Sequence, residues 1–560
     1  MIRFRVADLG GNSVIGRSLV AGRFVAPAIL ALASWPAVAA GGDDPRTERW
    51  NAAVAKILSR KELDGATVGI ELRSLKNDAR VGSRNVNRAF APASNLKLVT
   101  LYLSLQILGP EWNFQTQLVA GGPIVEGGRL EGDLWVRGGG DPTLQPAFFE
   151  TEDENAPLVP FVEAAQLAGV RHVKGDLVVD DRLFDRQFIP DGWPQNQLEE
   201  EYAAPVAALS LGGNCLHVRV TTHAGQSPTA ELRPPVFGWR LLTDLAPANG
   251  SQFQVGIISP DPQGTLRIRG SVGNEVGVAT AKLPVADPPL FFGNAYRAAL
   301  ERAGVIVAGS VRRAAPDEQP DAKAHTLFTR RSPLLPALQR CGKESDNTIA
   351  EHLLKCCAAV RFGVGTDERG AELVAALCKE LGVDGANVKV VDGSGLSHLD
   401  SVTPTFLGAV LVKAYAAPWR DDFVRCLPIS GVDGTLEKRM SEPAMVYRVR
   451  AKTGFISQVS ALSGYALAGD FVGAAAGGVP GGGEKGGSKG PGEKGGEKGG
   501  EKGASKAAAS ERAFADGGAD REVFAFSILI NGFKGANAEM KRVQDDLCRA
   551  IVALPRAEGK

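Results

Sequence analysis

Pro92-Ala93-Ser94-Asn95-Leu96-Lys97 opens a strongly apolar run that continues to Leu108 and ends at Gly109-Pro110. This pattern predicts a buried helix with Ser94 at its first turn. Ser94 and Lys97 stand three residues apart and therefore lie on one face of that helix. A desolvated lysine beside a serine hydroxyl can take its proton and turn it into a nucleophile. About one Ser-x-x-Lys pattern is expected by chance in a chain of 560 residues, so this stretch needs support from elsewhere.

Two further short motifs supply that support. Ser345-Asp346-Asn347 comes directly before a helix predicted from Thr348, and Lys452-Thr453-Gly454 opens a strand-like run. Together they offer a second proton carrier, a side-chain amide for a peptide, and a cation that faces a carboxylate. Taken separately, Ser345 is typical of a helix N-cap, Asn347 of a turn, and Lys452 of a solvated strand end.

The three motifs together form the known signature of β-lactamases and penicillin-binding proteins. Their order and context agree with it, because the first begins a helix, the second precedes one and the third begins a strand. Further stretches resemble one branch, the class C low-molecular-mass penicillin-binding proteins, the D-alanyl-D-alanine carboxypeptidase/endopeptidase family. They are Gly-Asp-Leu at 132–134, Gly-Gly-Asp-Pro-Thr-Leu at 139–144, Ala-Glu at 350–351, Asp-Gly-Ser-Gly-Leu-Ser at 392–397 and Gly-Val-Asp-Gly-Thr-Leu at 431–436.

The resemblance covers residues from about 50 to 555, and the 250 or so residues between Ser94 and Ser345 are similar to that family's large insert domains. It implies an α/β (α+β) fold, in which a transpeptidase-like domain with helices on an antiparallel sheet is interrupted by a mostly-β insert of one or two domains. It also implies a serine-type D-alanyl-D-alanine carboxypeptidase or endopeptidase that cuts peptidoglycan stem peptides through an acyl-enzyme.

The resemblance assigns roles to the motif residues. The expected catalytic residues are Ser94 as nucleophile, Lys97 as acceptor of its proton, and Ser345 as a helper. The expected substrate-binding groups are the Asn347 amide for the peptide, Lys452 and Thr453 with Gly454 for the terminal carboxylate, and the backbone N–H groups of Ser94 and Phe455 for the oxyanion.

Some positions depart from the family pattern. His398 follows the 392–397 stretch where the family often has a basic residue, and Phe455-Ile456-Ser457-Gln458 is bulkier than the usual small residues. Both segments are expected to flank the cleft, so they bear on the choice of peptide. Asp180 and Phe184 in the insert resemble positions that approach the cleft and contact a diaminopimelate side chain; ordinary strand-end and core roles are the alternative.

The sequence indicates no cofactor and no metal. His352 and Cys356 lie four residues apart with Cys357 beside them, but no third ligand is evident, which favours an ordinary helix face. Residues 138–140 are glycine-rich without the lysine of a phosphate-binding loop.

Two alternative functions remain open at the level of sequence. One is a serine β-lactamase, and the other is a non-catalytic peptidoglycan-binding or scaffold protein. The chain has no Glu-x-x-Leu-Asn of the class A β-lactamase kind, so we expect β-lactams to act as covalent inhibitors that are released slowly.

The pattern along the chain predicts a discontinuous organisation. The catalytic domain is expected at 46–115 and 331–560, and the mostly-β insert at 116–330, with strands such as 130–137 and 172–180. Residues 471–520 are a Gly-Gly-Glu-Lys low-complexity segment that is expected to form a disordered loop between two strands.

The N-terminus predicts export. Basic residues at 3, 5, 17 and 23, a short apolar run at 24–35 and Ala37-Val38-Ala39 are typical of a cleaved signal peptide over 1–39. This predicts a secreted, periplasmic protein with at most peripheral membrane association. Lys plus Arg and Asp plus Glu number 63 each, so charge suggests no nucleic-acid partner. Seven cysteines leave at least one unpaired in a monomer, and neither the disulfide pairs nor the oligomeric state follows from sequence.

Overall fold

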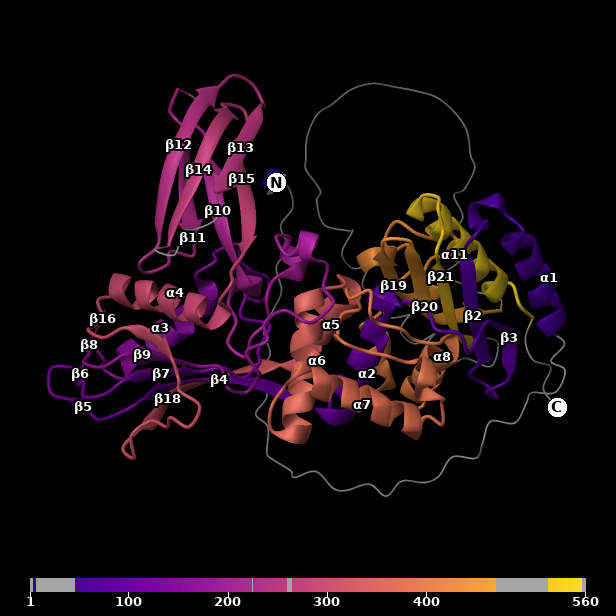
Figure 1. The fold of residues 1–560 in the computed structure, drawn as a ribbon, viewed down its shortest axis with the longest axis horizontal. Coiled ribbons are helices and arrows are strands. Elements are labelled where there is room, and N and C mark those ends of the chain that lie inside the picture. The colour runs from indigo at the N-terminus through magenta and orange to yellow at the C-terminus, as the bar shows by residue number, and fades with distance from the viewer. Residues whose placement is uncertain (1–3, 7–45, 224, 259–263, 470–521, 556–560) are drawn as a thin grey trace, which may run out of the picture.

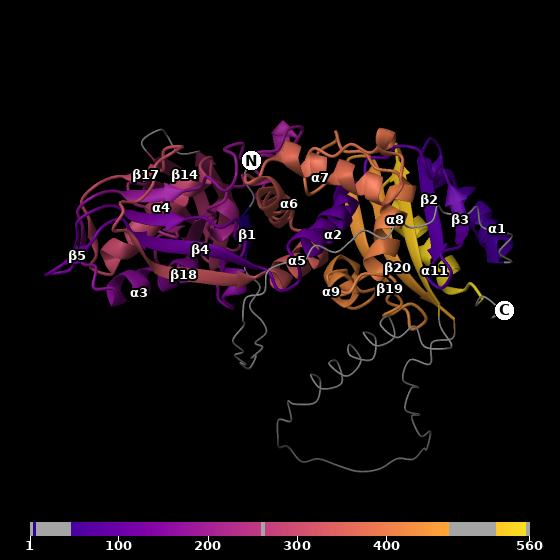
Figure 2. The same cartoon turned by 90° about the horizontal axis from the view of Figure 1, so that it is seen from below.

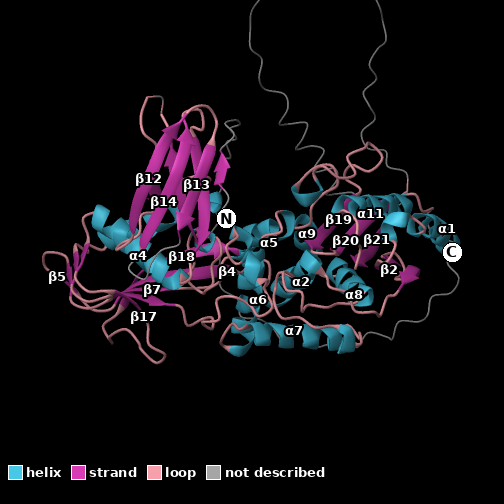
Figure 3. Ribbon diagram, turned by 45° about the horizontal axis from the view of Figure 1, so that its top comes forward, coloured by secondary structure: helices cyan, strands magenta, loops and turns pink. Residues whose placement is uncertain are grey.

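The computed structural model describes residues 4–6, 46–223, 225–258, 264–469 and 522–555. The predicted low-complexity loop at 471–520 lies outside the described residues, as does the predicted signal peptide apart from residues 4–6. Figures 1 and 2 show two parts side by side along the long axis, a strand-rich part and a helix-covered sheet. Figure 3 shows the same contrast by secondary structure.

A five-stranded antiparallel sheet forms the centre of the helix-covered part. Its order is β19 (Val449–Ile456), β20 (Val459–Ala468), β21 (Glu522–Asn531), β2 (Thr67–Ser74) and β3 (Arg80–Arg84). Strands from both ends of the chain therefore pair directly, with Thr67 opposite Asn531. The two strands predicted on either side of residues 471–520 are confirmed as β20 and β21.

Helices cover both faces of this sheet. On one face lie α2 (Lys97–Ile107), α5 (Leu334–Lys343), α6 (Asn347–Phe362), α7 (Asp367–Glu380), α8 (Pro404–Tyr415) and α9 (Arg420–Arg425). On the other face lie α1 (Arg46–Leu58) and α11 (Asn537–Val552). Successive β21 residues alternate between the two cores, Ala525 and Leu529 facing α2 and α8, Phe526 and Ile528 facing α1 and α11. Both faces are thus buried, which explains why β20 and β21 are apolar almost throughout.

The strand-rich part carries four further sheets and two helices. One sheet has the order β17 (Val311–Arg313), β9 (Leu177–Asp180), β7 (Leu134–Arg137), β4 (Asn113–Ala120) and β18 (His325–Pro333), and a small one the order β16 (Ile306–Val307), β8 (His172–Val173), β6 (Arg129–Leu130) and β5 (Ile124–Val125). Helices α3 (Val159–Leu167) and α4 (Pro288–Arg302) pack on them.

The other two sheets of this part face each other across a small apolar core, upright in Figure 1. They are β1 (Phe4–Val6), β15 (Val278–Pro284), β10 (Cys215–Thr221) and β11 (Thr229–Arg233), and β12 (Arg240–Ala248), β14 (Thr265–Gly273) and β13 (Phe253–Ile258).

Local details differ from the sequence predictions. The single strands predicted at 130–137 and 172–180 are each broken into two, β6 with β7 and β8 with β9, because turns at 131–133 and 174–176 move the chain from one sheet to the next. The predicted boundaries at 115/116 and 330/331 fall inside β4 and β18, which pair with each other from Asn113 opposite Pro333 to Ala120 opposite His325. These two paired strands lead into and out of the strand-rich part together.

Candidate active site

Ser94 lies at the mouth of α2, as the sequence predicts. Residues Ala93–Leu96 form one 3-10 turn that runs straight into α2 at Lys97. Ala93 has a φ of 46°, in the left-handed region that non-glycine residues seldom adopt, and this turn brings Ser94 to the surface of the cleft. The Nζ of Lys97 donates a hydrogen bond to the Oγ of Ser94 at 3.0 Å.

Lys97 is fully buried, and its ammonium group has three acceptors. Besides Ser94, its Nζ donates to the Oδ1 of Asn347 at 2.7 Å and to the carbonyl oxygen of Ser394 at 2.7 Å. Burial lowers the pKa of Lys97 below the ordinary lysine value, because desolvation penalises the charged form. A neutral lysine in hydrogen-bond reach of a serine hydroxyl is a general base for that serine.

A second lysine–serine pair faces the first. The Nζ of Lys452, on β19, donates to the Oγ of Ser345 at 2.8 Å and to the carbonyl oxygen of Thr453 at 2.9 Å. Burial lowers the pKa of Lys452 well below its ordinary value, and the positive charge of Lys97 lowers it further. Ser345 has a φ of 62°, so this serine too stands on a strained turn, directly before α6.

The three motifs are tied together by hydrogen bonds and close backbone contacts. The Nδ2 of Asn95 donates to the carbonyl oxygen of Lys452 at 2.9 Å. A Cβ added at Gly454 would lie 2.9 Å from the carbonyl oxygen of Pro92, so only glycine lets β19 approach the Ser94 turn this closely. Because β19 is an edge strand of its sheet, this end of it can pair with an extended peptide.

Two pockets meet at Ser94, Ser345 and Phe455 and together form the cleft. The first is also lined by Pro194, Gln197, Tyr202, Asn347, Gly395, Leu396, His398, Ile456 and Ser457. The second is also lined by Thr435, Arg439, Thr453, Gly454, Ser460, Lys541 and Gln544. No Asp or Glu is among these described lining residues. The second pocket is therefore the cationic side of the cleft.

The predicted substrate-binding residues divide into two sets. Thr453, Gly454 and Phe455 line the cleft, and Phe455 is 54% exposed there. Asn347 also reaches the cleft, but its amide is occupied at both ends, since its Nδ2 donates to the carbonyl oxygen of Tyr202 at 2.9 Å. His398 and residues 455–457, which differ from the family pattern, also line the cleft.

Asp180 and Phe184 are not brought into this cleft. The carboxylate of Asp180 accepts hydrogen bonds from Arg137 at 3.1 Å and Arg182 at 2.8 Å. Phe184 is 2% exposed and packs edge-on against the ring of His352, with centroids 6.1 Å apart. Both side chains have the strand-end and core surroundings that the sequence left as the alternative.

Sequence reasoning missed several cleft residues. The Oγ1 of Thr435 accepts a hydrogen bond from the Oγ1 of Thr453 at 2.8 Å, and the 431–436 stretch is the sequence signal that points to it. Ser394 belongs to the 392–397 stretch, to which the sequence assigns no role, yet its carbonyl oxygen accepts a hydrogen bond from Lys97. Arg439, Lys541 and Gln544 come from α11 and the loop before β19, and nothing in the local sequence marks them.

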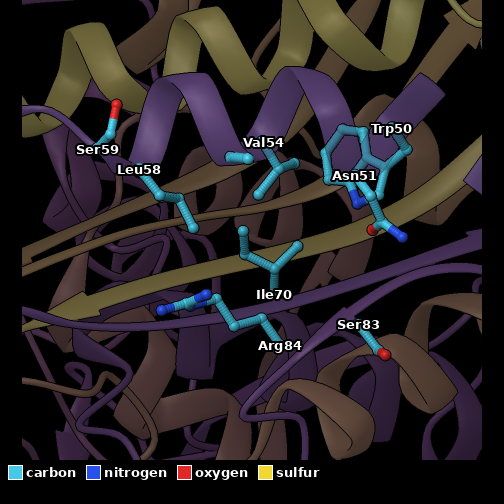
Figure 4. Close-up of a pocket in the computed structure, with 9 residues that line it drawn as sticks. Trp50, Asn51, Val54, Leu58, Ser59, Ile70, Ser83 and Arg84 are labelled. Carbon is cyan, nitrogen blue, oxygen red and sulfur yellow. The ribbon is translucent and has the colours of Figure 1, made fainter. Parts of the chain in front are cut away.

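Two other places in the molecule, the surroundings of His352 and a pocket beside α1, do not have the residues of a metal site or of this active site. His352 is buried, with its Nδ1 2.7 Å from the carbonyl oxygen of Thr348 and its Nε2 2.9 Å from the Oγ of Ser210. Within the described residues, no three His, Cys, Asp or Glu side chains gather as metal ligands. Figure 4 shows a pocket between α1 and the β2–β3 hairpin, where Trp50, Val54 and Ile70 meet Arg84, and none of the motif residues lines it.

Comparison with known proteins agrees with this geometry. The chain is similar to the D-alanyl-D-alanine carboxypeptidase of Actinomadura sp. (strain R39), 33% identical over 429 residues that cover 73% of this chain and 77% of that protein. It is 26% identical to D-alanyl-D-alanine carboxypeptidase DacB of Haemophilus influenzae over 73% of this chain and 84% of that one. The fold matches the crystal structure of penicillin binding protein 4 from Haemophilus influenzae with a TM-score of 0.67, 21% identity, and coverage of 89% and 99%.

No helix in the described ranges is long and apolar enough to cross a membrane. The fold match confirms the transpeptidase-like α/β class predicted from the motifs. Residues 50–550 match the D-Ala-D-Ala carboxypeptidase 3 (S13) family. The family predicted from the motifs is thereby confirmed: this chain is an enzyme of the D-Ala-D-Ala carboxypeptidase 3 (S13) family.

Proposed function

We propose that this enzyme cleaves the bond after a D-alanine in peptidoglycan stem peptides through an acyl-enzyme on Ser94. The observation that carries the proposal is the buried Lys97 amine, 3.0 Å from the Ser94 hydroxyl, opposite the Lys452–Ser345 pair. In acylation, neutral Lys97 takes the hydroxyl proton while Ser94 attacks the carbonyl carbon. The backbone N–H groups of Ser94 and Phe455 hold the oxyanion.

The leaving amine needs a proton, and the second pair can deliver it. Lys452 donates to Ser345, whose own hydroxyl proton can pass to the amine as the C–N bond breaks. The released residue carries a carboxylate, and we assign its binding to Thr453 and Thr435, which line the cationic side of the cleft, with the buried Lys452 next to Thr453 in the chain. Water then attacks the ester at Ser94: one proton of the water replaces the proton that the Lys452–Ser345 pair gave up, and Lys97 returns its proton to the Ser94 oxygen as the C–O bond breaks.

Slow release of β-lactams is part of the same proposal. Fast hydrolysis of a penicilloyl ester requires a base aimed at its carbonyl, and neither pocket around Ser94 has an Asp or Glu among its described lining residues. The β-lactam therefore stays on Ser94. Because the substrate is the cell wall, we propose a periplasmic location, in agreement with the predicted signal peptide.

A fluorescent penicillin tests this function. We expect covalent label that persists for many minutes on the wild type, no label on Ser94→Ala, and release of D-alanine from a pentapeptide by the wild type alone. Fractionation of the producing cells tests the location, and we expect the labelled protein in the periplasm. Rapid loss of label with hydrolysed drug would indicate a β-lactamase instead, and an unlabelled wild type would support a non-catalytic scaffold.

A further inference from the structure

The loop at 392–397 lies directly against the base of the proposed reaction. When Lys97 is neutral, its amine keeps two N–H groups and one lone pair. The carbonyl oxygen of Ser394 and the Oδ1 of Asn347, each 2.7 Å from Nζ, accept those two hydrogens. The lone pair is then left facing the hydroxyl of Ser94. The direction of the lone pair depends on where the Ser394 carbonyl stands.

Two buried carboxylates hold the loop that carries this carbonyl: Glu351 accepts the backbone N–H of Gly393 at 2.6 Å, and Asp392 binds the backbone around Ser394 itself. The Oδ1 of Asp392 accepts the backbone N–H groups of Ser394 at 3.0 Å and Gly395 at 2.6 Å. Its Oδ2 accepts the backbone N–H of Ser397 at 2.9 Å and the indole N–H of Trp193 at 2.9 Å. Asp392 is fully buried, so these four hydrogen bonds form out of water and the loop wraps tightly around the carboxylate.

The same loop is anchored to both parts of the molecule. On the catalytic side, the Oγ1 of Thr100, one turn beyond Lys97 on α2, donates to the carbonyl oxygen of Gly393 at 2.6 Å. On the other side, Trp193 belongs to the segment between β9 and β10 and is buried against Leu396. Asp392 thus stands where α2, the cleft loop and the strand-rich part meet.

We propose that Asp392 is a positioning residue for acylation: it holds the Ser394 carbonyl, which, together with Asn347, aims the Lys97 lone pair at Ser94. Trp193 secures Asp392 from the strand-rich part. The proposal rests on the proposed function, because it assumes that Lys97 is the base. Asp392 also acts through its charge: burial lowers the pKa of Lys97, and the negative charge of Asp392 offsets part of that shift.

Asp392→Asn in the full chain tests this role. The new NH2 group would face N–H donors, so the loop loses its hold on the Ser394 carbonyl. With fluorescent penicillin, we expect the first-order acylation rate constant to fall about 100-fold, the effect of a misplaced catalytic group. The dissociation constant of the noncovalent complex should stay unchanged. The acidic limb of the acylation rate should move to lower pH, because Lys97 loses the nearby negative charge.

Asp400→Asn is the matched control. Asp400 is buried on the same loop, accepts the backbone N–H of Val391 at 2.8 Å and shares a side-chain hydrogen bond with Asp392. Burial raises its pKa well above the ordinary value, and the charge of Asp392 raises it further, which favours the protonated acid; asparagine keeps an N–H donor toward Asp392 and adds no charge. We expect acylation and its pH profile to match the wild type.

Trp193→Phe tests the positioning role of Asp392 if Asp392→Asn does not fold. It removes one hydrogen bond to Asp392 and keeps the buried ring, and we expect acylation to slow about fivefold at unchanged noncovalent affinity. A lower melting temperature with unchanged acylation and an unmoved acidic limb would overturn the proposal for either variant. Failure of the proposed function is separate, since it would show as an unlabelled wild type.

Discussion

Two buried lysines face each other in this site, and their pKa values determine how the rate of acylation depends on pH. Burial lowers the pKa of Lys97, and burial together with the charge of Lys97 lowers that of Lys452. The acylation rate should therefore rise with pH and reach half its plateau below 10.5, the ordinary lysine value. As pH falls through the lowered pKa, Lys97 takes a proton and can no longer accept one from Ser94.

This pH dependence is measurable as the rate of penicillin acylation from acid to alkaline pH, with the noncovalent affinity as the internal control. The two lysines titrate as a pair, so the midpoint belongs to both. Stability should depend on pH in the same direction. Between the lowered pKa of the folded protein and 10.5, the unfolded chain binds more protons than the folded one, so the free energy of unfolding rises with pH across this range. A midpoint near 10.5 would contradict a buried base.

Elements of this site touch through glycines, and Gly395 makes the closest contact. It has a φ of 76°, and an added Cβ would lie 1.9 Å from the carbonyl oxygen of Ala93, next to the nucleophile. We expect Gly395→Ala to lower the free energy of unfolding by about 3 kcal/mol or more and to slow acylation, because the loop or the Ser94 turn must shift.

Gly109→Ala is the control for that substitution. Gly109 follows the other end of α2, has a φ of 83°, and has open space where a Cβ would go. We expect Gly109→Ala to lower the free energy of unfolding by about 1 kcal/mol, the cost of placing alanine in the left-handed conformation, and to leave acylation normal. Equal losses of stability and activity in the two variants would show that the Ala93 contact is unimportant. Chemical denaturation and penicillin acylation give both readouts.

Individual helices and strands can be predicted well from sequence where one physical signal dominates. The apolar runs of β20 and β21 and the Ser94 helix are found because burial on all sides leaves few polar residues. The start of α4 is harder to predict from sequence, because Pro288-Pro289 suggests a turn. Proline fits the first turn of a helix, however, and Asp287 caps this one by accepting the N–H of Leu290 at 3.1 Å.

For the whole molecule, short motifs point to the candidate catalytic residues but not to their surroundings. Ser94, Ser345 and Lys452 carry their own local context, so their meeting could be predicted. Trp193 and Gln544 come from segments without such a pattern, and only the fold brings them to the cleft or beneath it. The disposition of Asp180 and Phe184 likewise depends on how the strand-rich part docks, which no local signal encodes.

The seven cysteines show how burial can protect a whole chain chemically. All seven lie in the described residues, all are free and all are buried, spread from β10 to α11. Burial raises their pKa values, to about 12 for Cys215 and Cys341 and about 11 for Cys378, so little reactive thiolate exists near neutral pH.

We therefore expect a thiol reagent to modify almost none of them in the folded enzyme and all seven after unfolding in denaturant without reductant. Reductant should leave the melting temperature unchanged. Fewer than seven thiols in the unfolded chain would reveal a disulfide and would contradict this arrangement, whereas rapid reaction of the folded enzyme would show that one of these cores opens to solvent.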